Sequence, residues 1–211
     1  EQIMKNSKIG RLVVALVVCG TTVPALASTN YGDFIGTTVI YQDVTESSGT
    51  DPGQLFMKDP QIFGDTLDFN PTFIANAANG ASKIKDAQVN FDVIAKSGFG
   101  IEGLVFTERG DYSLSGSAGT TSTLADVSAN FFLDIVEVDN SVITPISLNL
   151  SMGFSPNANG TFDLINDPGG IWTGALTVDL DAALDAKNIS YTLGATRVMV
   201  VFDNTLKAQS E

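Results

Sequence analysis

The densest group of side chains that could do chemistry lies in the segment Gly64-Asp-Thr-Leu-Asp-Phe-Asn-Pro71. Here Asp65, Asp68 and Asn70 could supply oxygen ligands to calcium, which takes about six to eight of them. The alternative is a turn, in which the same side chains hydrogen-bond to nearby backbone and lead into a strand that ends before Pro71. Calcium is the one cofactor that these residues suggest.

A second pair of carboxylates, Asp179 and Asp181, alternates with Leu180. Residues two apart in a strand share one face, about 7 Å from each other. Two carboxylates at about this separation could act in glycoside hydrolysis or hold a cation. The alternative is an ordinary solvated strand face, because nothing in the sequence marks either residue as buried.

The only tryptophan, Trp172, follows the turn residues Pro168-Gly-Gly170. An exposed aromatic ring on a β-protein can stack on a sugar, so Trp172 is a candidate carbohydrate contact. The alternative is a core position or a ring packed under a loop, which is the commoner place for tryptophan.

The composition narrows the chemistry further. Histidine is absent and the only cysteine is Cys19, which excludes Ser-His-Asp catalysis and the usual zinc sites. Any catalysis would rest on carboxylates, lysine or tyrosine. The chain carries 24 acidic and 11 basic residues, a net charge of −13, without a basic cluster that could bind phosphates. We therefore predict a non-catalytic protein without a nucleic-acid partner.

The sequence pattern predicts that these residues are positioned by β-strands. Apolar and polar residues alternate with a period of two in 88–93, 146–154 and 176–181, which predicts strands with one buried and one wet face. Residues 197–202 are apolar on both faces and predict a central or covered strand. Further strands are predicted at 38–44, 66–69, 100–107 and 131–138. Only 181–186 could be helical, for one turn.

Turn residues separate these strands at 51–53, 79–80, 109–110, 157–160 and 167–170, and the Ser, Gly and Thr-rich stretch 113–122 predicts a loop. Short strands punctuated in this way predict an all-β fold, an antiparallel two-sheet β-sandwich that is jelly-roll-like. We expect one domain over residues 28–211. Its predicted core contains Val89, Phe91, Val93, Leu148, Leu150, Leu176, Val178, Leu180, Val198 and Val200.

The beginning of the chain predicts a secretory signal peptide, which would precede the β domain as a helix. Basic residues lead into the apolar run 12–18, which is shorter than the about 20 residues that span a bilayer. The run leads to Ala25-Leu26-Ala27, a pattern that signal peptidase accepts, with cleavage before Ser28. We read residues 1–3 as read-through upstream of the first methionine, Met4. The expected location is outside the cytoplasm, at the cell surface or beyond it.

Several segments resemble a group of exported bacterial proteins that carry a PEP-CTERM sorting signal. They are 31–34, 38–46, 64–71, 108–114 and 201–211. The resemblance implies partners in the export and sorting machinery, and residence at the cell surface or in an exopolysaccharide matrix. Members of this group end in Pro-Glu-Pro, an apolar helix and arginines. We therefore expect the gene to continue past Glu211 into such a tail.

Together these observations favour a non-catalytic, exported β-sandwich protein of the cell surface or extracellular matrix. The alternative is a carbohydrate-binding module, which would bind extracellular polysaccharide through an exposed aromatic row. Less expected is a carboxylate-dependent glycoside hydrolase, which needs two inward-facing carboxylates in a cleft.

The predicted signal peptide makes the N-terminus of the mature protein a direct test. Cleavage after Ala27 should leave Ser28 as the first residue of protein recovered from outside the cytoplasm. N-terminal sequencing measures this, and a retained Met4 or Lys5 would contradict export by cleavage.

Overall fold

The structure is a computed structural model that describes residues 28–50, 57, 60–69, 71, 73–116 and 122–211. Of these residues, 63% lie in strands and 4% in a helix, and every strand pairing is antiparallel. The predicted all-β class is therefore confirmed. The predicted signal peptide, with Ala25 and Ala27, lies outside the described residues.

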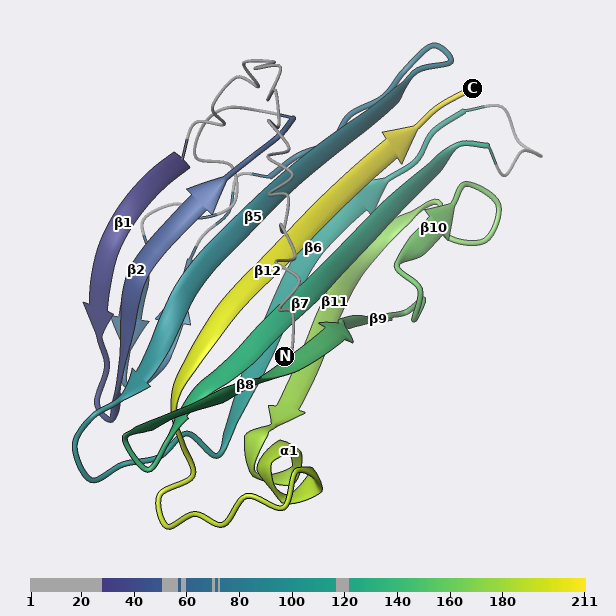
Figure 1. Ribbon diagram of the computed structural model, residues 1–211. Coiled ribbons are helices and arrows are strands. Elements are labelled where there is room, and N and C mark those ends of the chain that lie inside the picture. Colours follow the sequence, from purple (N-terminus) through teal and green to yellow (C-terminus); the bar gives the residue numbers. More distant parts are fainter. Residues whose placement is uncertain (1–27, 51–56, 58–59, 70, 72, 117–121) are drawn as a thin grey trace, which may run out of the picture.

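The larger sheet is built around three long strands: β5 (Ser82–Ala95), β12 (Ala195–Gln209) and β7 (Leu124–Val138). Beyond β5 lie β2 (Val39–Ser47) and then β1 (Ser28–Ile35) at the edge. On the other side, β7 pairs with both β8 (Ser141–Ser151) and β10 (Thr161–Asp163). Because β12 lies between β5 and β7, the prediction of a central strand at 197–202 is confirmed (Figure 1).

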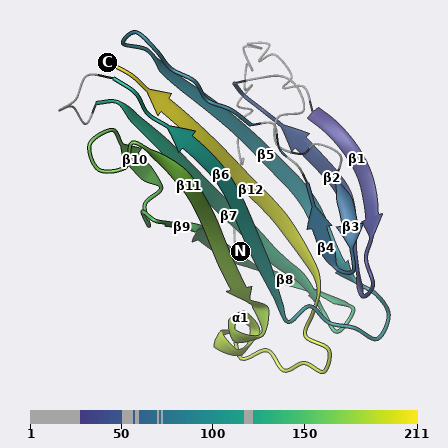
Figure 2. The same cartoon turned by 180° about the vertical axis from the view of Figure 1, so that it is seen from behind.

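A smaller sheet of β6 (Gly103–Ser113), β11 (Gly169–Asp179) and β9 (Gly153–Ser155) packs on one face of the larger sheet. Figure 2 shows β6 and β11 running in nearly the same direction as the long strands of the larger sheet. Side chains join the two layers directly: the ring centroids of Phe106 in β6 and Phe131 in β7 are 4.5 Å apart. The hairpin of β3 (Gln61–Phe63) and β4 (Thr66–Asp68) forms a separate two-stranded sheet.

The core lies between the two layers, and it is formed by every second residue of the long strands. Alternate residues of each long strand are buried: Val89, Phe91 and Val93 in β5, Phe131, Leu133 and Ile135 in β7, and Val198, Val200 and Phe202 in β12. Seven of the ten predicted core residues are buried, and Leu148, Leu150 and Leu176 are partly buried and pack against them. The predicted core is therefore confirmed.

Two predictions of local structure are wrong. Arg109 and Gly110 do not form a turn but lie inside β6, because the ring of Trp172 occupies the space beside Gly110: a Cβ there would be 2.5 Å from it. The predicted strand 176–181 ends at Asp179, where the helix α1 (Leu180–Ala186) begins, seven residues rather than one turn. No helix among the described residues is long and apolar enough to cross a bilayer.

The predicted turns elsewhere have mixed outcomes. Asn79 and Gly80 form a turn with φ of 56° and 77°, which explains the choice of Asn and Gly there. A turn also precedes Gly160, whose φ is 74°. Gly169 and Gly170 instead begin β11, and 51–53 lies outside the described residues. The predicted loop 113–122 begins with the last residue of β6 and is described only in part.

The inward register of β12 can be tested with two neighbouring residues. Val200 is 1% exposed and Met199 is 44% exposed on the opposite face. Val200→Asp should abolish cooperative folding, because an unpaired buried charge costs more than the stability of a typical domain. Met199→Asp should retain a far-UV spectrum rich in β-structure and a cooperative thermal transition. A cooperative transition in Val200→Asp would contradict the register.

Candidate functional site

A single carboxylate interrupts the apolar face of β6. The residues of this strand that point toward the larger sheet alternate as Leu104, Phe106, Glu108, Gly110 and Tyr112. The side chain of Glu108 is therefore directed into the core by the same alternation that buries Phe106. Its atom Oε2 is buried and has no hydrogen-bond partner among the described residues.

The residue that meets Glu108 across the core is Asn204, on the inner face of β12. Asn204 is 1% exposed and follows Val198, Val200 and Phe202 along the same buried row. Its Nδ2 donates a hydrogen bond to Oε1 of Glu108, with 2.5 Å between the two atoms. Like Oε2 of Glu108, Oδ1 of Asn204 is buried without a partner. The contact thus leaves two buried acceptor oxygens unsatisfied.

Small residues surround this acid–amide pair. Asn204 lies opposite Ala87 of β5 and Ala129 of β7, and Glu108 lies opposite Gly174 of β11. Ala87 and Ala129 are buried beside Asn204. The space over Gly174 is filled by Met152 and Phe154, which lie where its Cβ would be.

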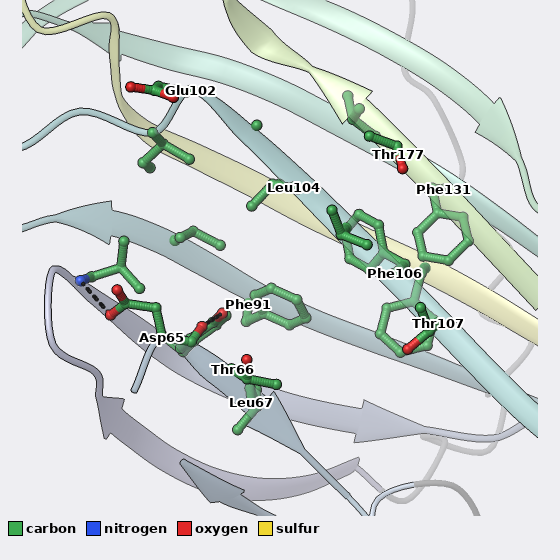
Figure 3. A pocket seen from close by; sticks show the side chains of 18 of the residues that line it. Asp65, Thr66, Leu67, Phe91, Glu102, Leu104, Phe106, Thr107, Phe131 and Thr177 are labelled. Carbon is green, nitrogen blue, oxygen red and sulfur yellow. Dashed lines mark hydrogen bonds between the residues drawn. The ribbon is translucent and has the colours of Figure 1, made fainter. Parts of the chain in front are cut away.

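Two cavities meet at Glu108. One has a volume of about 920 Å³ and extends between β4 and β6; the other, about 1220 Å³, extends along β6 toward Trp172. Figure 3 shows the rings of Phe91, Phe106 and Phe131 gathered around the first cavity. The first cavity falls within the volumes of about 300–1,000 Å³ that are usual for small-molecule sites, and its lining combines these rings with acids such as Asp65, Glu102 and Asp181.

Burial changes the acidity of Glu108. It raises the pKa of this carboxyl from its ordinary value of 4.5 to about 7, because the charged form loses water, and the hydrogen bond from Asn204 opposes this only in part. Glu108 forms no ion pair with any other described residue. Near neutral pH the pair can therefore offer either a carboxylate or a neutral acid to a molecule in the cavities.

The predicted calcium ligands have different surroundings. The carboxylate of Asp65 accepts hydrogen bonds from the backbone N–H and the hydroxyl of Thr38, both at 2.7 Å, and these lower its pKa. Asp65 thereby joins the β3–β4 hairpin to the start of β2. Asp68 is exposed at the end of β4, and Asn70 lies outside the described residues. Within the described ranges, no three acidic, histidine or cysteine side chains are grouped to hold a metal, and calcium stays a prediction.

Asp179 and Asp181 do not share a strand face, since Asp181 lies in α1. Asp179 caps this helix by accepting a hydrogen bond from the backbone N–H of Ala182 at 2.8 Å. The pKa of Asp181 is raised by burial and by the neighbouring acids Glu102, Asp179 and Asp185. The two carboxylates therefore lie on different elements, one at the end of β11 and one in α1, although both line the first cavity described above.

Trp172 lies inside the protein. It is 8% exposed, and its ring meets Phe154 edge-on with 5.8 Å between the centroids. Its ring also covers Gly110 and lines the second cavity. Trp172 therefore presents no open ring face to solvent, and the predicted sugar contact would have to be made within the cavity.

Sequence reasoning missed Glu108 and Asn204, although a signal for each was present. Asn204 continues the alternation of Val198, Val200 and Phe202 by one step and so falls on the buried face. Glu108 lies between the predicted strand 100–107 and the turn predicted at Arg109, so the predicted alternation stopped one residue before it. A polar residue in the buried phase of a strand is the signal that would have found both.

A scan against protein-family models and searches of curated proteins and of solved structures gave no match. Function is therefore inferred from the geometry of the described residues.

The titration of Glu108 predicts how stability depends on pH. Because its folded pKa is raised, the folded chain binds more protons than the unfolded chain between about pH 4.5 and 7, and this group destabilises the fold increasingly as pH rises through that window. Glu108→Gln cannot ionise and can also donate to Oδ1 of Asn204. It should stabilise the protein by roughly 2–3 kcal/mol more at pH 8 than at pH 5.

Urea unfolding of both proteins at the two pH values measures this difference. An equal effect of Glu108→Gln at pH 5 and pH 8 would show that Glu108 ionises with an ordinary pKa and is not buried as described.

Proposed function

We propose that this protein is an exported, non-catalytic surface or matrix protein that binds a small, largely apolar molecule between its two sheets. The observation that carries the proposal is the pair of cavities that meet at Glu108, the second of which Asn204 also lines. Their walls are rich in aromatic rings, and their polar centre retains two unpaired oxygens. Apolar walls would supply affinity, and the polar pair would orient the bound molecule.

The architecture that suits this role is a two-sheet antiparallel sandwich of the predicted jelly-roll-like kind. In support, the chain passes repeatedly between the layers: β5 to β6, β6 to β7, β10 to β11 and β11 to β12 each change sheet. Each crossing fixes one layer against the other. A cavity between layers held in this way can exist before its ligand arrives.

A binding role also fits the other carboxylates. Asp65 joins the hairpin to β2, and Asp179 caps α1. Asp139 accepts hydrogen bonds from the backbone N–H groups of Thr192 and Leu193, which lower its pKa. These acids have structural tasks that explain their positions without catalysis. Export is supported by the signal-peptide pattern that ends at Ala27.

The cavity can be tested with N-phenyl-1-naphthylamine, a neutral apolar dye that fluoresces when it leaves water. The protein should bind the dye saturably. Leu104→Trp, which adds a large ring to the wall of the first cavity, should weaken binding at least 10-fold. The control Met199→Trp adds the same ring on the outer face of β12 and should bind like the wild type. Thermal melts would show that both variants fold.

Absence of saturable dye binding by the folded wild-type protein would overturn the proposal. Retention of that protein on extracellular polysaccharide would then favour the carbohydrate-binding alternative.

A further inference from the structure

We propose that the molecule bound in these cavities is an amphipathic primary amine, whose ammonium group hydrogen-bonds to Glu108 and Asn204 and whose apolar chain lies against the aromatic rings. This inference rests on the proposed binding function. The chemical class of the ligand is inferred from the two acceptor oxygens and the carboxylate charge that have no partner among the described residues.

The first argument is the kind of hydrogen bond that is missing. Oε2 of Glu108 and Oδ1 of Asn204 are both acceptors, both are buried, and neither has a partner in the part of the chain that the structure describes. A buried unsatisfied polar atom costs about 1–3 kcal/mol, so two such atoms beside each other mark a place where a donor is expected. A primary ammonium carries three N–H donors, whereas an alcohol carries one.

The second argument is charge. Two cations line the second cavity, but neither neutralises Glu108. Arg109 is exposed on the outward face of β6, and Nζ of Lys207 lies 3.5 Å from Asp126. The carboxylate of Glu108 therefore receives only the neutral amide of Asn204. An ammonium group would supply the opposite charge in a place where little water screens the attraction.

The third argument is the shape and lining of the space. Glu108 lines both cavities and Asn204 lines the second, so a head group at the pair lies where the two spaces adjoin. From Glu108 the first cavity continues past Phe106, Phe91 and Phe202. These rings offer apolar area to an alkyl chain, and an aromatic face also attracts a cation.

Three ligands of equal chain length separate these contributions. Decylamine has both charge and donors, decyltrimethylammonium has charge without N–H donors, and decanol has a donor without charge. Each is used below its micelle concentration at pH 8 to displace N-phenyl-1-naphthylamine from the full chain. Decylamine should displace the dye at concentrations at least 10-fold lower than either of the others.

Two variants test whether this preference for decylamine depends on Glu108. In Glu108→Gln the advantage of decylamine over decanol should fall to less than 3-fold. Asp43→Asn removes one exposed acid of β2 and should keep the wild-type preference, since it alters net charge equally. Equal displacement by the three ligands, or a preference that survives in Glu108→Gln, would overturn the inference while leaving the binding function intact. Failure of the dye itself to bind would instead refute the proposed function.

Discussion

The contact between Glu108 and Asn204 places a polar link between β6 and β12 inside an apolar core. A carboxylate and an amide cannot be placed in an apolar core at random, because each must find a partner to offset its lost water. The hydrogen bond between them links β6 to β12 at this point. Ala87 and Ala129 lie opposite Asn204 in the neighbouring strands.

Glu108 differs in its energetic effect from the acids that stabilise the turns. Backbone N–H groups surround Asp65 and Asp139 and lower their pKa, so their charged forms favour the folded state. Burial raises the pKa of Glu108, so its charged form opposes folding. A glutamine at this position would satisfy Asn204 without that penalty. A destabilising ionisable group within a cavity is typical of a site that serves binding rather than stability.

The strands and the core could be predicted from the sequence because both depend on local alternation. Val89 and Phe91 are buried and have polar neighbours along the strand, which the order of residues already shows. The helix at Leu180 and the continuous strand at Gly110 could not be predicted in this way. Gly110 resembles a turn residue until the ring of Trp172, which comes from another strand, is placed beside it.

The candidate site could not be predicted from the sequence for a related reason. Glu108 and Asn204 are 96 residues apart and belong to different sheets, so their meeting depends on how one layer is placed on the other. Alternation can mark each residue as a polar interruption of a buried face, but one interruption alone is more often a local defect in packing. A candidate binding site is recognised only when two such residues contact each other, here with Glu108 at the junction of two cavities lined by aromatic rings. Together they demand particular chemical groups of a ligand. That demand is for hydrogen-bond donors and positive charge, which the described protein does not itself supply there.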